Sequence, residues 1–362
     1  MTYSSTPLEL IKPAHMESWL VAGVLYLLLA FYPQALAIQM AAWLWAALMI
    51  YGGTQERLGH TTACIFVAGF AYYAHWFYHF PHESYTNDLK HHIRYLKFIQ
   101  DHPFDIYSYT GKESWHPPFY YTLAGLWELV ISQQFGPQLH ASLRVFALAM
   151  YMVYGLYALL TLRLVHRRED MPYWIGCILI VFWPISVILA TRINNDVMMY
   201  MVWSMFYYYF LRWYKEGSQT LLAVAVMMVG VGFMVKTSAA IPAALLGIVI
   251  AYRLYGGRLR LSDLFSVRML PAYLLLTVGM VFNQGKGIYL YFHHEEWLTQ
   301  LGQKSKAQDV LNKVLSFDLS HYLMNPYLGK ALWHQPNQTG YFLKTMLYGE
   351  FNWHQRAIAT FM

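Results

Sequence analysis

Long stretches of apolar residues, almost free of charged side chains, recur along this 362-residue chain. Apolar and aromatic residues make up 57% of it and charged residues only 12%, whereas a soluble chain carries about 25% charged residues. The sequence therefore predicts an all-α polytopic membrane protein. It excludes a disordered chain, a secreted disulfide scaffold and an ordinary cytosolic enzyme.

The apolar stretches predict about nine membrane helices. A helix that crosses a bilayer needs about 20 largely apolar residues, and several stretches are at the short end of that length. The predicted spans are 17–33, 35–51, 61–80, 141–162, 172–190, 197–214, 219–236, 238–254 and 268–284. A tenth apolar stretch, 117–135, contains Glu128, and a carboxylate is costly in the middle of a bilayer.

Basic residues set the predicted orientation of these helices. Cytoplasmic loops are enriched in Lys and Arg. Three short connections are strongly basic: 163–170, 212–217 and 253–260. If they face the cytoplasm, the connections 192–196 and 236–238 lie outside, and 117–135 must stay on or in the outer leaflet without crossing.

This orientation makes residues 1–362 a single transmembrane domain with two long external loops, 81–140 and 285–340. In the second loop, apolar residues recur at helical spacing between charged residues, which indicates juxtamembrane amphipathic helices. Thirteen of the 16 histidines fall on or near the external side. Because the spans themselves are nearly free of polar residues, this concentration favours a surface active site over a transport pore.

The segment after the third span carries the first chemical candidate. Residues 85–100 predict a helix on the membrane surface. Its polar face, which looks away from lipid, carries Asp88, His91, His92 and Tyr95. Asp88 falls in the first turn, where the positive helix end favours the ionised carboxylate that a general base requires. Simple capping of the helix by Asn87 and Asp88 is the alternative, and the sequence leaves both roles open.

Three further stretches place polar residues on the external side. Glu113 and His116 precede two consecutive prolines, after which a helix can begin. Arg192 and Lys236 stand at two other external turns, and Asp196 follows Arg192 closely. At one level the two cations would make an anion site, although a lone cation near a helix end can also snorkel to the interface.

The order and spacing of these stretches resemble the GT-C superfamily of polytopic glycosyltransferases. The closest resemblance is to the branch of the protein O-mannosyltransferases and the aminoarabinose transferases of bacterial lipid A. The matching features are an acidic residue soon after an outward span, then HPP-aromatic-YY, then R-x-x-N-D and K-T-S at later span ends. In this sequence they are Asp88, His116–Tyr121, Arg192–Asp196 and Lys236–Ser238. With the stretch Tyr341–Phe351, the resemblance covers about residues 61–351.

The resemblance implies transfer of a sugar from a polyprenyl-phosphate or pyrophosphate donor to an acceptor on the extracytoplasmic face. Asp88 would be the base that deprotonates the acceptor for in-line attack, with inversion at the anomeric carbon. Arg192 and Lys236 would bind the donor phosphate. The residues that would bind sugar hydroxyls or a divalent metal ion are Glu113, His116 and Asp196, with Glu113 and His116 as the metal ligands. No other cofactor is implied.

The implied partners are the lipid-linked sugar, membrane lipids and an acceptor that is a lipid, a glycan or a protein, and nothing points to nucleic acid. The basic loops fit an ER membrane or a bacterial inner membrane, and we favour the latter. Two spans precede the family's usual first one, and the chain stops soon after residue 351, as a shortened or truncated enzyme would. The alternative is a non-catalytic membrane scaffold or lipid-binding protein. A transporter fits less well because matching helices broken at mid-bilayer are missing from the sequence pattern.

Overall fold

A computed structural model describes residues 47–48, 50–79, 89–109, 111, 116–135 and 139–294. The described residues form helices and their connections, with no β-strand among them, so the predicted all-α character is confirmed for this part of the chain. The longer helices are α3 (His60–His79), α6 (Leu139–Val165), α9 (Asp196–Glu216), α10 (Gln219–Val235), α11 (Ala240–Tyr255) and α13 (Leu270–His294). The shorter ones are α4 (Leu89–Asp101), α5 (Phe119–Phe135), α7 (Met171–Phe182), α8 (Pro184–Thr191) and α12 (Leu261–Leu264), with 3-10 turns at Thr237–Ala239 and Val267–Met269.

Every predicted span from 61–80 onward coincides with helical structure. The predicted span 172–190 is divided into α7 and α8, because Pro184 has no N–H to continue the helical hydrogen bonds of α7. Two helical segments in the described part are long and apolar enough to cross a membrane, Ser142–Val165 and Thr237–Tyr255. The span 17–33 and most of 35–51 lie outside the described residues, and the total of nine spans stays a prediction.

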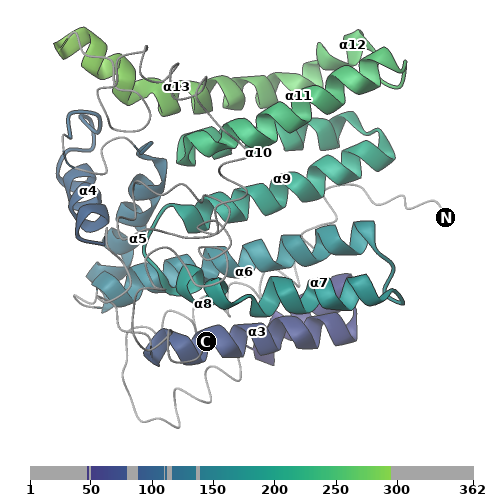
Figure 1. Cartoon of the computed structure of the whole chain (residues 1–362). Coiled ribbons are helices and arrows are strands. Elements are labelled where there is room, and N and C mark those ends of the chain that lie inside the picture. The colour runs from purple at the N-terminus through teal and green to yellow at the C-terminus, as the bar shows by residue number, and fades with distance from the viewer. Residues whose placement is uncertain are drawn as a thin grey trace, which may run out of the picture.

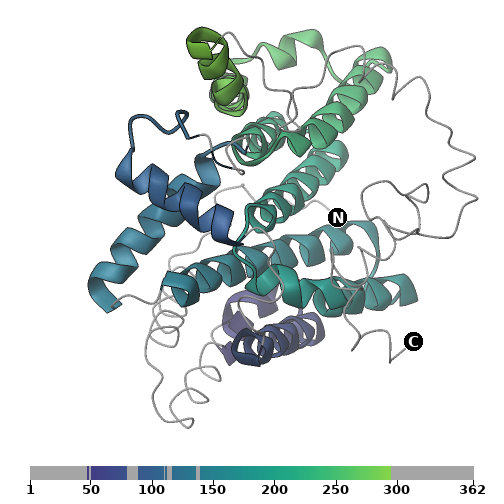
Figure 2. The ribbon, with the colours of Figure 1, turned by 60° about the vertical axis from the view of Figure 1, so that its left-hand side comes forward.

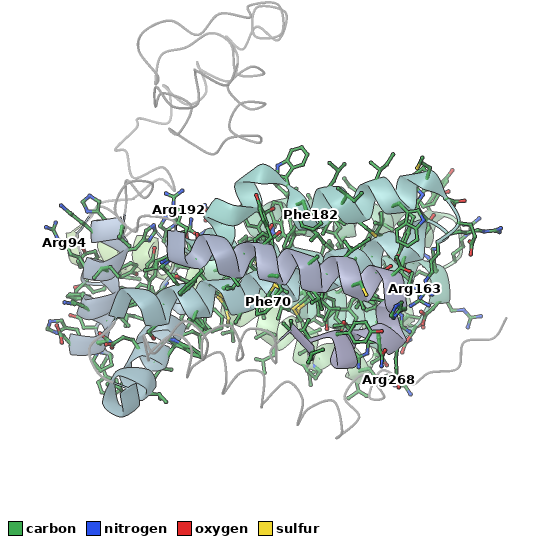
Figure 3. The ribbon with its side chains drawn as sticks, turned by 90° about the horizontal axis from the view of Figure 1, so that it is seen from below. Phe70, Arg94, Arg163, Phe182, Arg192 and Arg268 are labelled. Carbon is green, nitrogen blue, oxygen red and sulfur yellow. The ribbon has the colours of Figure 1, made fainter. Side chains whose placement is uncertain are left out.

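The long helices lie side by side and alternate in direction (Figure 1). Arg94 and Arg192 lie toward one end of this bundle, whereas Arg163 and Arg268 lie toward the other (Figure 3). The three basic connections thus share one end, which we call the basic end, as the charge pattern predicts. The opposite end, where α3 and α8 finish, is called the polar end below.

Helices α4 and α5 gather at the polar end, next to each other in both ribbon views (Figures 1 and 2). Because α3 ends and α6 begins at this end, α5 does not run the length of the bundle, in agreement with the prediction for 117–135. Helix α5 begins directly after the two prolines, as predicted. The polar face of α4 packs into the protein: His92 and Tyr95 are 5% and 1% exposed.

Helices α10 and α13 cross at a pair of glycines. A Cβ atom added to Gly279 would lie 2.1 Å from the carbonyl oxygen of Gly230. Small residues let two backbones approach this closely, which is a common device where membrane helices pack. One turn beyond Gly279, the Asn283 amide donates to the Phe233 carbonyl at 2.8 Å and accepts from the Thr237 hydroxyl at 3.2 Å. The crossing therefore fixes the turn that follows α10.

Candidate functional site

Two connections meet at the polar end of the bundle, 192–196 between α8 and α9 and 236–239 between α10 and α11. The Asn194 side chain accepts a hydrogen bond from the backbone N–H of Val197 at 3.3 Å and so caps the first turn of α9. The Asn195 amide donates to the Val235 carbonyl, at the end of α10, over 3.5 Å. Both asparagines are almost fully buried. Their burial shows that these connections are fixed by polar contacts inside the protein.

An ion pair joins the two connections. The Lys236 ammonium donates to Oδ1 of Asp196 at 2.5 Å, and the two side chains are 30% and 36% exposed. Although burial raises the pKa of the Asp196 carboxyl, the nearby Lys236, followed by His116 and Arg192, lowers that pKa below its usual value. The Asp196 carboxylate is therefore ionised at neutral pH and lies close to three cationic or basic side chains.

His116 reaches this region from the segment that precedes α5, and α4 holds it there. The His116 side chain is 5% exposed, and its ring stacks near that of His92 at a centroid distance of 6.3 Å. His92 Nδ1 lies 2.7 Å from the Tyr121 hydroxyl, and the Tyr95 hydroxyl donates to the His116 carbonyl at 3.3 Å. A buried network of aromatic and imidazole groups thus fixes the position of His116.

Tyr120 is a site residue that the sequence analysis did not single out. Its side chain is 1% exposed, and its hydroxyl is buried without a hydrogen-bond partner among the residues that the structure describes. Burial, and secondarily the Asp196 carboxylate, raise the pKa of the Tyr120 phenol above its usual value. A buried hydroxyl without a partner is costly and calls for an explanation, and here the protonated phenol stands near the site as an unused donor.

Arg192 and Arg144 stand together at the end of α8. The Nε atom of Arg192 is buried and has no hydrogen-bond partner in the described part of the chain. Arg144, on α6, is 4% exposed, donates from Nε to the Thr191 carbonyl at 3.0 Å and lies 4.4 Å above the Phe77 ring. Arg144 therefore fixes the residue that precedes Arg192. The sequence did contain a signal for it, since a charged residue inside a predicted span marks a candidate site.

The structure brings together four of the residues that the sequence analysis named as site residues: His116, Arg192, Asp196 and Lys236. The other two, Asp88 and Glu113, lie outside the described residues. No group of three or more His, Cys, Asp or Glu side chains gathers as a metal site within the described ranges. Because Glu113 is not among them, the metal site stays a prediction.

The described residues form a bundle of apolar helices with a cluster of polar and charged side chains at one end. Residues 116–282 match the model of the dolichyl-phosphate-mannose-protein mannosyltransferase family. This match confirms the predicted resemblance to GT-C glycosyltransferases. No curated protein and no solved structure matches the chain.

The matched family is described as a mannosyltransferase that uses dolichyl-phosphate-mannose, and the match supports the general class of glycosyltransferase for this chain. The four predicted site residues that come together, together with Tyr120 and Arg144, all fall inside the matched segment 116–282. Asp88 and Glu113 precede it. The described part of the candidate site therefore lies within the part of the chain that resembles this family.

Proposed function

We propose that this chain transfers a sugar from a polyprenyl-phosphate donor to an acceptor on the extracytoplasmic face of a membrane, with inversion at the anomeric carbon. The observation that supports it most is the meeting of Arg192, Asp196, Lys236 and His116 at one end of the bundle, inside the matched segment. The description of the matched family suggests mannose as the sugar and a protein as the acceptor. A bacterial inner membrane remains our preferred location.

Arg192 and Lys236 would bind the donor phosphate. An ammonium group has three donors, and the bond to Asp196 uses one of those on Lys236. The buried Nε of Arg192 has no hydrogen-bond partner among the described residues, so a phosphate oxygen would satisfy it. Charge-assisted hydrogen bonds of this kind stabilise the negative charge that builds up on the leaving phosphate.

Asp88 would act as the general base that deprotonates the acceptor. It precedes the first described residue of α4, and helical spacing relates it to His92 and Tyr95. Those two side chains belong to the buried network that holds His116. A base at this position would face the acceptor from the side of α4, while the phosphate is bound from the side of α8 and α10.

Glu113, His116 and Asp196 would bind the sugar hydroxyls or a divalent metal ion. In this structure one oxygen of Asp196 is occupied by Lys236, which favours Glu113 and His116 as the metal ligands if a metal binds. Such an ion would supply positive charge to the leaving phosphate. A carboxylate and an imidazole are both suitable ligands for a first-row divalent metal.

The test is transfer of radiolabelled sugar from a panel of polyprenyl-phosphate sugars by the purified full chain. We expect one donor to be retained and used, and Asp88→Asn to bind it normally while transferring at least about 100-fold more slowly. Asparagine caps a helix as well as aspartate does, so a capping role alone would leave the rate nearly unchanged. Asp101→Asn, at the exposed far end of α4, is the matched control and should transfer normally.

Two results would contradict this proposal in different ways. If the wild-type chain neither retains nor uses any donor of the panel, the proposed transferase function is wrong. If the wild type transfers and Asp88→Asn does so at a near-normal rate, only the assignment of the base is wrong, and Glu113 or Asp196 becomes the next candidate.

A further inference from the structure

A cavity lies on the side of the bundle, between α6, α7 and α9, and the proposed reaction does not use it. Its volume is about 450 Å³, and its lining runs from Tyr154 and Tyr200 to His166. Tyr154 and His166 are twelve residues apart along and just past α6, so the groove extends for about 18 Å at 1.5 Å per residue. One leaflet contributes about 15 Å to the hydrocarbon core of a bilayer. The groove thus has the length of one acyl chain.

The groove opens sideways, on the outer surface of the bundle. Val165 and Tyr200, both in its lining, are 57% and 37% exposed, whereas the walls behind them are aliphatic and aromatic side chains of α6, α7 and α9. Among the described residues this surface is open, and in a chain with membrane-spanning helices we expect it to face lipid. An apolar groove that is open to lipid along its length suits a hydrocarbon chain better than a polar substrate.

Basic side chains lie next to one end of the groove, the end nearer the basic end of the bundle. His166 lines it, and Arg167 is exposed beside it. The Lys215 ammonium donates to the Leu164 carbonyl, so this cation lies at the last turn of α6, next to the mouth of the groove. Basic residues outnumber acidic ones in both connections that flank the mouth. The mouth is thus complementary to an anionic headgroup.

We propose that this groove binds an anionic phospholipid from the leaflet at the basic end, with one acyl chain between α6 and α9 and the phosphate beside Lys215 and His166. The charged mouth lies at the end of the bundle opposite to Arg192 and Lys236 (Figure 3 marks Arg192 and Arg163 at these two ends). A lipid held here is therefore a second ligand, distinct from the sugar donor, whose phosphate would lie at the polar end.

Native mass spectrometry of the full chain tests this proposal with phosphatidylglycerol, phosphatidylcholine and a polyprenyl phosphate offered separately. We expect phosphatidylglycerol to bind more tightly than phosphatidylcholine with the same acyl chains. Lys215→Gln should weaken phosphatidylglycerol binding about fivefold, since one cation near a membrane surface contributes about that much. Ala158→Trp places an indole in the groove and should exclude the acyl chain, so we expect it to weaken phosphatidylglycerol binding at least about tenfold.

Matched controls separate these effects from general changes of charge or surface. Arg258→Gln removes a cation from the same end of the bundle, and Ala251→Trp adds an indole to the exposed face of α11; both should bind phosphatidylglycerol like the wild type. The proposal is overturned if Ala158→Trp retains full phosphatidylglycerol binding. It is also overturned if phosphatidylglycerol and phosphatidylcholine bind equally well. The same holds if Ala158→Trp weakens the binding of polyprenyl phosphate but not that of phosphatidylglycerol. Because the assay reads lipid binding, its outcome does not depend on transferase activity.

Discussion

The crossing of α10 and α13 makes a quantitative prediction for Gly279→Ala. The added Cβ atom would meet the Gly230 carbonyl oxygen at 2.1 Å, and real Cβ atoms essentially never approach other atoms closer than 3.0 Å. The obstacle is the backbone of another helix, which cannot rotate away as a side chain can. The two helices must therefore separate by about 1 Å, and overpacking of this kind costs about 1–3 kcal/mol.

The separation also strains the bonds of Asn283, one turn further along α13. Its two hydrogen bonds, to the Phe233 carbonyl and from the Thr237 hydroxyl, join α13 to the end of α10. Each such bond contributes about 1 kcal/mol, so we expect Gly279→Ala to lower the free energy of unfolding by about 3–5 kcal/mol in total if both bonds are lost. Thr237 directly follows Lys236, so a shift of Thr237 also moves Lys236. We therefore expect the donor to bind less tightly.

The assay is thermal unfolding in detergent, followed by tryptophan fluorescence, with Gly287→Ala as the control. Gly287 lies in the same helix, and a Cβ atom there would meet nothing within 4 Å. Replacing glycine with alanine raises the helix propensity by about 1 kcal/mol in both variants. The difference between their unfolding free energies therefore measures the cost of the clash at Gly279. Equal unfolding midpoints for the two variants would refute the close crossing. A destabilised Gly279→Ala with unchanged donor affinity would refute only the link to Lys236.

Three further outcomes are expected. Arg192→Ala and Lys236→Ala should each raise the dissociation constant of the donor about ten- to a hundredfold with unchanged unfolding midpoints. If neither variant changes the affinity, the two side chains are cations that only extend to the membrane interface and do not bind the donor. Tyr120→Phe should weaken donor binding or transfer without loss of thermal stability, because it removes an unpartnered buried hydroxyl; wild-type kinetics would exclude a role for that group. Cysteines introduced at 112 and 138 should be labelled from the same side of the membrane, and labelling from opposite sides would overturn the predicted orientation.

Hydrophobicity and charge were sufficient to predict the framework of this fold. The helices α6, α9, α10 and α11 begin and end within a few residues of the predicted spans, because each is an apolar run closed by charged or turn-forming residues. The charge rule also predicted that 192–196 and 236–238 share one end of the bundle, since an odd number of crossings separates each of them from the basic connections. These are local signals that survive in a single sequence.

The contacts inside the site could not be predicted in the same way. Lys236 and Asp196 are 40 residues apart, and no periodicity links them, so their ion pair follows only from how α9 and α10 pack. Tyr120 and Arg144 were overlooked for a related reason. An aromatic residue in a helix is usually part of the core, so nothing in the sequence was a reason to choose Tyr120. The charge of Arg144 inside a predicted span was a signal, but its burial and its bond to the Thr191 carbonyl are visible only in three dimensions.

The ion pair between Lys236 and Asp196 is compatible with a phosphate site because it is only partly buried. Two cations near one another in the absence of the donor would repel, and the Asp196 carboxylate offsets that repulsion and holds Lys236 in place. If the pair were fully buried, breaking it would cost about 3–5 kcal/mol and would oppose donor binding. With about a third of each side chain exposed, the pair contributes no more than about 1 kcal/mol, so an incoming phosphate can share or displace Asp196 at little cost. The same exposure predicts that Asp196→Asn leaves the fold intact while it changes how tightly the donor is held.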